Sequence, residues 1–185
     1  MFDIPATPLT FPDEGIRRDG LLFRLPTDDD MDTIAPAFLD DEIGGRANMP
    51  PVDADTLRSL NPLVPERMAQ GMFMPLLVVD AESGEILGGL ALHQLNWELG
   101  QGEIGYWLFP QARGRGVATR AARFLAEHAF ELGLERVEAR VFTGNPESER
   151  VLERAGFTRE GVVRSMPVPG DRRIAKTLFS LLPGE

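Results

Sequence analysis

The segment Gln111-Ala-Arg-Gly-Arg-Gly-Val-Ala-Thr-Arg120 has the residue types and spacing of a binding site for a phosphorylated ligand. It lies between an apolar run at 104–109, typical of a strand, and a run at 118–132, typical of a helix. A strand that leads through a glycine-rich turn into a helix leaves backbone N–H groups unpaired. The positive end of the helix dipole attracts anions to these donors. Two glycines allow close approach and Arg113 and Arg115 add charge, so the segment predicts a phosphate or pyrophosphate site.

Few other reactive side chains are available. The chain has no cysteine, which excludes disulfides, cysteine-ligated zinc and thiol nucleophiles. Its two histidines, His93 and His128, are far apart in sequence, so we expect no metal site. These two histidines are the only imidazoles available as ligands or bases.

Charge and length restrict the class of protein and its partners. The net charge of -10 over 185 residues argues against nucleic acid as a partner. The sequence has no apolar run of the roughly 18–20 residues that a membrane span requires and no signal pattern at its start, which predicts a soluble cytoplasmic protein without a membrane partner. Residues 1–110 carry 6 Arg and 19 acidic residues, whereas residues 111–185 carry 13 Lys or Arg and 10 acidic residues. This asymmetry suits a cationic substrate and an anionic cofactor, although a solvated surface with arginine-rich codon usage explains it equally well.

The elements that must position the turn follow from hydrophobic periodicity and turn residues. We expect one domain over 1–185, with residues 1–19 as an N-terminal arm. Strands are predicted at 20–26, 73–80, 85–93, 101–109, 134–142, 157–166 and 174–182. Helices are predicted at 28–39, 53–70 (interrupted by prolines), 117–132 and 146–155. This order predicts an α/β fold with a mixed sheet.

Three segments together resemble one family. They are Gly102-Glu-Ile-Gly-Tyr-Trp-Leu108, Arg113-Gly-Arg-Gly-Val-Ala118 and Asn145-Pro-Glu-Ser-Glu-Arg-Val-Leu-Glu-Arg-Ala-Gly-Phe157. The combination is similar to the GNAT superfamily of N-acyltransferases, and more narrowly to its RimJ/RimL-like subgroup. The correspondence covers residues 85–185, while the earlier part agrees only in its helix–helix layout.

The resemblance implies a GNAT-type fold of about seven mostly antiparallel strands and about four helices, with central strands that splay apart. It implies acetyl-CoA as the cofactor, with its pantetheine arm between the splayed strands and its pyrophosphate on the amides of the turn. The cofactor-binding residues carried over are Trp107, Leu108, Phe109, Arg113, Gly114, Arg115, Gly116, Val117, Ala118, Thr119 and Asn145.

Two residues are expected to carry catalysis. Glu103 lies on the splayed strand, where a buried carboxylate of raised pKa would deprotonate an attacking amine. Ser148 falls in the first turn of the helix at 146–155, which the resemblance places near the cofactor sulfur, where a hydroxyl would assist the departing thiolate. Each also has an ordinary structural interpretation, as a solvent-facing carboxylate and a first-turn serine. Tyr106 could compete as donor, but such a tyrosine is more often a packed core residue.

The reaction expected is acetyl transfer to a primary amine by direct attack in a ternary complex. Alternatives are a non-catalytic acyl-CoA sensor on the same fold, or the same enzyme with succinyl-CoA as donor. The acceptor stays open between a protein N-terminus, a lysine side chain and a small cationic amine such as a polyamine or an antibiotic, and a homodimer is expected. The sequence departs from the subgroup at Ile174-Ala175-Lys176, where an acidic residue is common, so acceptor contacts of that strand do not carry over.

Overall fold

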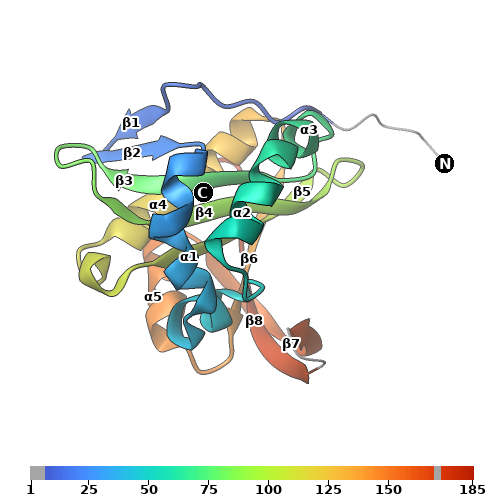
Figure 1. Ribbon diagram of the computed structural model, residues 1–185. Coiled ribbons are helices and arrows are strands. Elements are labelled where there is room, and N and C mark those ends of the chain that lie inside the picture. The colour runs from blue at the N-terminus through green and yellow to red at the C-terminus, as the bar shows by residue number, and fades with distance from the viewer. Residues whose placement is uncertain (1–6, 169–171) are drawn as a thin grey trace.

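The computed structural model describes residues 7–168 and 172–185, and one mixed sheet forms its centre (Figure 1). The eight strands follow the order β1-β2-β3-β4-β5-β6-β8-β7, and every pair is antiparallel except β5 with β6. Their bounds are β1 Ile16–Arg18, β2 Leu21–Arg24, β3 Met74–Asp80, β4 Ile86–Asn96, β5 Gln101–Leu108, β6 Arg136–Phe142, β7 Thr158–Val168 and β8 Arg172–Leu181. The predicted mixed α/β fold is therefore confirmed.

The strand count differs from the prediction because the expected N-terminal arm contains a strand. Ile16–Arg18 pairs with β2, although too short to show a period in the sequence. Before it, Leu9 and Phe11 are buried, and the Leu9 N–H donates to the carbonyl of Met68 at 2.8 Å. The described part of the arm is thus packed onto the domain. Residues 1–6 lie outside the described residues.

Helices account for the rest of the regular structure. They are η1 Asp28–Asp30, α1 Met31–Leu39, η2 Asp41–Gly45, α2 Ala54–Leu60, η3 Asn61–Leu63, α3 Val64–Ala69, η4 Pro110–Ala112, α4 Val117–Glu131 and α5 Pro146–Ala155. The helix expected at 53–70 is divided into α2 and α3 by a short 3-10 segment that contains Pro62, because proline has no N–H for the helical ladder.

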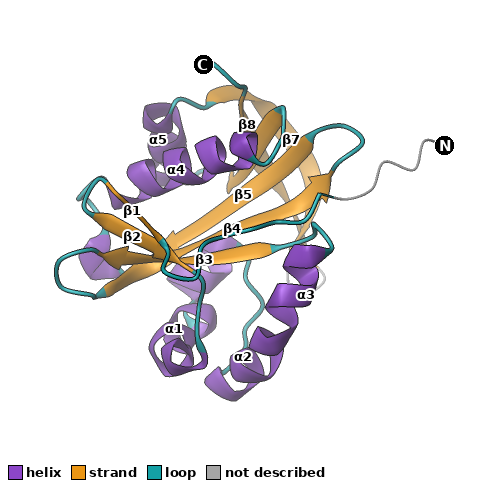
Figure 2. Cartoon of the chain, turned by 90° about the horizontal axis from the view of Figure 1, so that it is seen from above, coloured by secondary structure: helices purple, strands orange, loops and turns teal. Residues whose placement is uncertain are grey.

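Helices cover both faces of the sheet (Figure 2). Helix α4 packs on one face and contacts α5, and its buried stripe includes Ala121, Ala122 and Leu125. On the other face, Met31 and Ile34 of α1 pack against Leu77 and Val79 of β3. Strand β3 is nearly continuous in buried residues for this reason. The hairpin of β7 and β8 continues beyond the helices, as Figure 1 shows.

Candidate active site

The site lies where the two central strands separate. Strands β5 and β6 pair in parallel only from Gln101↔Arg136 to Glu103↔Glu138, although β5 continues to Leu108 and β6 to Phe142. Their C-terminal halves therefore lack each other as hydrogen-bond partners. The predicted splay of the central strands is confirmed.

The glycine turn leads from β5 into α4 in a left-handed conformation. Gly114 and Gly116 have φ angles of 73° and 71°, which strain any residue with a Cβ. Gly116 is the N-cap of α4, and among the described residues no side chain caps this helix start. The first N–H groups of α4 are therefore free of side-chain partners, as a phosphate-binding helix start requires.

A cavity of about 460 Å³ joins this turn to α5, the end of β5 and the segment around η2. Most predicted cofactor residues line it: Trp107, Leu108, Arg113, Gly114, Gly116, Val117, Ala118, Thr119 and Asn145. Ser148 and Tyr106 line it as well. The sequence did not indicate the wall formed by Glu42, Ile43 and Arg46, because this short irregular segment carries no periodic pattern.

Two predicted cofactor residues lie outside this cavity. The Phe109 N–H donates to the carbonyl of Leu87 at 2.9 Å. Arg115 lines a second cavity of about 400 Å³, where its Nη2 lies 3.9 Å from a carboxylate oxygen of Asp80. Their contact with a cofactor stays a prediction.

The start of α5 places a hydroxyl pair in the cavity. Asn145 caps the helix by accepting from the Ser148 N–H at 3.2 Å, with Pro146 in the first turn, so the predicted N-cap is confirmed. The Tyr106 hydroxyl lies 2.6 Å from the Ser148 Oγ and 3.2 Å from the Ser148 carbonyl oxygen. Burial raises the pKa of Tyr106 to about 12, which keeps its proton in place. Tyr106 thus does more than fill space in the core, because its hydroxyl contacts Ser148. In the sequence, the alternation of side chains along β5 indicated that Tyr106 lies on the face opposite Glu103.

Glu103 lies at the point of separation, on the sheet face opposite Tyr106. It is the last β5 residue paired with β6, its side chain is buried, and its carboxylate forms an ion pair with Arg140 of β6. Burial raises the pKa of Glu103, and the charge of Arg140 offsets part of that rise. The solvent-facing interpretation of Glu103 is wrong, whereas its role as a base stays a prediction.

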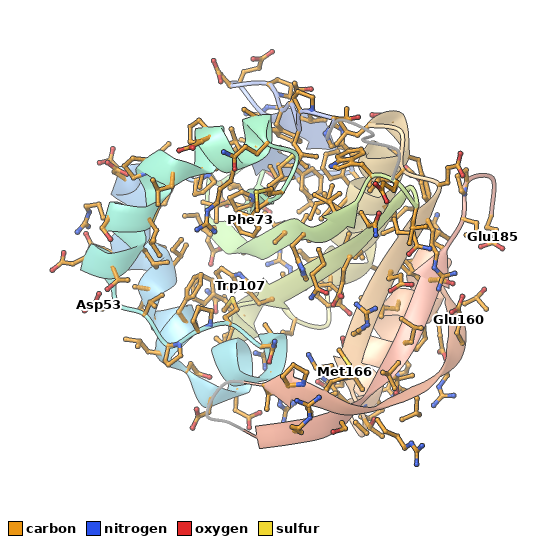
Figure 3. All side chains as sticks on the ribbon, turned by 90° about the vertical axis from the view of Figure 1, so that its right-hand side faces the viewer. Asp53, Phe73, Trp107, Glu160, Met166 and Glu185 are labelled. Atoms are coloured by element: carbon orange, nitrogen blue, oxygen red, sulfur yellow. The ribbon has the colours of Figure 1, made fainter. Side chains whose placement is uncertain are left out.

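Trp107 is fixed on the same face as Glu103 by two glycines of β4. A Cβ at Gly88 would lie 2.2 Å from the Trp107 carbonyl oxygen, and one at Gly89 would lie 2.6 Å from the indole Nε1. The indole also meets the Phe38 ring of α1 edge-on, with centroids 6.3 Å apart. Figure 3 shows this side of the molecule, with Trp107 on the sheet and Met166 near the end of β7.

Two further structural findings bear on the site. Among the residues at 7–168 and 172–185, no group of three or more His, Asp or Glu side chains is arranged to hold a metal ion. Within the same residues, no helix has the length and apolar character needed to cross a membrane.

Comparison with known proteins identifies the family. The family model for the acetyltransferase (GNAT) domain matches residues 20–158. The N-acetyltransferase p20 of Bacillus licheniformis, itself uncharacterized, is 28% identical over 159 residues, which are 85% of this chain and 89% of that protein. The ribosomal-protein-serine acetyltransferase of Escherichia coli (strain K12) is 31% identical over 81 residues, covering 43% of this chain and 45% of that protein.

A solved structure supports the same fold. The structure of Mycobacterium smegmatis RimJ in complex with CoA-disulfide superposes with a TM-score of 0.76 at 23% identity, covering 92% of this chain and 84% of that chain. With the family match, this confirms the resemblance that the sequence motifs indicated: the chain belongs to the GNAT acetyltransferase family and has RimJ/RimL-like relatives.

Proposed function

We propose that this protein is an N-acetyltransferase that moves the acetyl group of acetyl-CoA to a primary amine by direct attack in a ternary complex. One observation carries the proposal. A single cavity joins the start of α4, which no side chain caps, the capped start of α5 and the end of β5, which has no strand partner on its β6 side. The start of α4 suits a phosphate group, the free edge of β5 suits the amides of the pantetheine arm, and the start of α5 suits the thioester. A neighbouring structure of similar fold, that of Microcin C7 self immunity acetyltransferase MccE at 18% identity, is in complex with acetyl-CoA and AMP.

The first part of the proposal concerns cofactor binding. The backbone N–H groups of Val117, Ala118 and Thr119 receive the pyrophosphate, and Arg113 adds positive charge at the same wall. The edge of β5 that β6 leaves free beyond Glu103, near Trp107 and Leu108, pairs with the pantetheine amides, in the manner of an added strand.

The second part concerns the chemistry. Glu103 takes the proton of the acceptor amine, directly or through water, because only the neutral amine attacks the thioester carbonyl. The backbone near Leu108 polarises that carbonyl. As the C–S bond breaks, the hydroxyl pair of Ser148 and Tyr106, which the 2.6 Å contact holds together, donates a hydrogen bond to the departing thiolate, and the second proton that the acylated nitrogen loses ends on the CoA thiol. Because the chain has no cysteine, no cysteine acyl-enzyme intervenes.

The acceptor belongs to one of the classes expected from the sequence, a protein N-terminus, a lysine side chain or a small amine. One neighbouring structure is that of a spermidine N-acetyltransferase from Vibrio cholerae in complex with CoA and spermine. At 20% identity that neighbour supports the fold and leaves the acceptor of this chain open. We further propose that the protein is cytoplasmic and forms a homodimer. Light scattering of the purified protein tests the homodimer directly.

The test combines binding with turnover. Calorimetric titration should show binding of acetyl-CoA and CoA, and a thiol-release assay with a panel of primary amines should show acetyl-CoA consumption that depends on the amine. Binding without thiol release for every amine would support the non-catalytic sensor instead. Faster release from succinyl-CoA than from acetyl-CoA would support the alternative donor.

A further inference from the structure

The only lysine of the chain, Lys176, occupies an unusual place. It lies on β8, where it pairs with Phe142 of β6 and Val163 of β7, and its relative exposure is 6%. Its Nζ lies 5.1 Å from the centre of the Phe142 ring. Within the described residues it makes no hydrogen bond and no ion pair, so the cation–π contact leaves its donors free.

Lys176 shares one sheet face with the proposed base. Cross-strand partners and residues two apart on a strand point to the same side, which puts Lys176, Phe142, Arg140, Glu103 and His93 together. We call this set the charged face. It borders the place where β5 and β6 separate, on the side opposite the Tyr106 and Ser148 hydroxyls. Lys176 and Glu103 lie within range of each other's charge, since each changes the pKa of the other.

The other charges of this face are already paired. The Arg140 guanidinium binds Glu103 through Nη1 and Glu138 through Nη2, the latter at 2.6 Å, while its buried Nε has no partner among the described residues. Glu138 also accepts from the Nε of Arg136 at 2.9 Å. Burial lowers the pKa of His93 to about 4, with help from the positive charges of Arg140 and Lys176, so the imidazole is neutral. Lys176 is left as the cation without a direct partner among the described residues.

A buried ammonium group without a counter-ion is unfavourable, and a polar group left over in a site favours a ligand that satisfies it. Burial lowers the pKa of Lys176, the charge of Glu103 offsets part of that fall and the charge of Arg140 adds to it, and a bound anion would raise the pKa. The acidic N-terminal half pointed to a cationic acceptor, but salt screens charges beyond about 10 Å. Lys176, a charge close to Glu103 without a direct partner among the described residues, is therefore a better guide to the acceptor than the acidic N-terminal half.

Building on the acetyltransferase function proposed above, we propose that Lys176 binds a carboxylate of the acceptor, so that the substrate is a primary amine with a carboxylate a few bonds away. The carboxylate belongs to a free amino acid or to an acidic residue at a peptide N-terminus.

The kinetic test compares matched acceptors. The pairs are β-alanine with β-alaninamide, and an Asp-Ala-Ala peptide amide with its Asn-Ala-Ala counterpart. We expect the wild type to prefer the carboxylate member of one pair by about tenfold or more in kcat/KM, the scale of one charge-assisted hydrogen bond. Lys176→Met should remove that preference and leave the amide member within about threefold, whereas Lys176→Arg should retain part of it. Arg164→Met, at an exposed arginine of β7, serves as the control for loss of one positive charge.

A direct binding measurement accompanies the kinetics. Because the chain has one lysine, lysine labelled with 15N at Nζ gives a single side-chain NMR signal. Carboxylate acceptors added to the wild-type protein with CoA should shift this signal and raise the pKa read from it, whereas the amides should not. This readout needs no variant to fold, and it remains informative if no amine is acetylated.

The outcomes separate the two proposals. Thiol release at equal rates from both members of each pair, or a preference that survives in Lys176→Met, would overturn the role of Lys176 and leave the acetyltransferase intact. CoA binding without release from any amine would overturn the proposed reaction, and the NMR titration would still decide whether Lys176 binds carboxylates.

Discussion

Replacing Glu103 by glutamine tests the proposed base most directly, because the structure gives the carboxylate two roles that leave different signatures. As a base, Glu103 has a pKa raised by burial, and its ionised form is the active one. Activity should then rise as pH increases through that pKa. Removing a general base costs about 10²–10⁴-fold in rate. Glu103→Gln should lower kcat/KM by that factor and abolish the limb of the pH profile that Glu103 produces.

The second role is structural, and its magnitude follows from the partners of Arg140. Breaking a buried ion pair costs about 3–5 kcal/mol when the remaining charge has no other partner. Here Glu138 still accepts from the same guanidinium at 2.6 Å, and the glutamine carbonyl can accept in place of Glu103. We therefore expect a loss of about 2 kcal/mol. For a chain of this size that corresponds to a fall in Tm of about 4–8 °C.

The assay is thiol release between pH 5 and 9 with saturating acetyl-CoA, together with thermal unfolding of each variant. The substrate amine titrates alike with every variant, so differences between profiles report on the enzyme. Glu138→Gln is the matched control, since it removes a carboxylate from the same Arg140 and should keep the shape of the pH profile. If Glu103→Gln kept both the pH limb and kcat/KM while its Tm fell, the carboxylate would be a structural anchor and the base assignment would be wrong.

Three further predictions concern the hydroxyl pair, the glycine turn and the sheet edge. Ser148→Ala and Tyr106→Phe should each lower kcat by about tenfold, and the double variant should be little worse than either, because the two hydroxyls act as one unit. Gly116→Ala should weaken CoA binding in calorimetry and lower the free energy of unfolding by about 1–2 kcal/mol, since a Cβ disfavours its φ of 71°. Hydrogen bonds from Arg136 and Ser180 lower the pKa of Glu160 to about 2, so their stabilisation is present above pH 4.5 and is lost as pH falls toward 2. Glu160→Gln should therefore cost about 1 kcal/mol in urea unfolding at pH 7, after solvent screening, and almost nothing near pH 2.

Each of these has a result that contradicts it. Additive effects of the two hydroxyl variants would mean independent roles. Gly133→Ala is the control for the turn, because Gly133 has a φ of 100° at the other end of α4. If both glycine variants lost CoA binding equally, the loss would be due to a less stable α4 and not to the turn. If the free energies of unfolding of wild type and Glu160→Gln differed by the same amount from pH 7 to 2, titration of the Glu160 carboxylate would not be the source of the stabilisation.

The sequence predicted those parts of the molecule whose signals are local. The glycine-rich turn before α4 was predicted from Gly114 and Gly116, and α5 was predicted at its observed bounds because Asn145-Pro146 and Gly156 mark both ends. The wall around η2 and the Tyr106–Ser148 contact were not predicted. They depend on which segments the sheet brings together across more than forty positions, and no local pattern records that.

The charged face shows the same limit. The sequence predicted a strand at 134–142 but did not single out Arg140, since its partner Glu103 is on another strand. Lys176 stood out as a departure from the subgroup, but its burial is a tertiary property, as are the contacts around it. The donor site was thus predictable from one segment, whereas the acceptor side required four strands in register.

The short parallel pairing at the centre of the sheet has a mechanical consequence. It joins two antiparallel blocks, β1 to β5 on one side and β6, β8 and β7 on the other, through three residue pairs. Each block is held by long antiparallel ladders of its own, so the junction is the compliant part of the sheet. A ligand chain that pairs with both free strand ends would link the two blocks. Binding of the donor would therefore also make the whole domain more rigid.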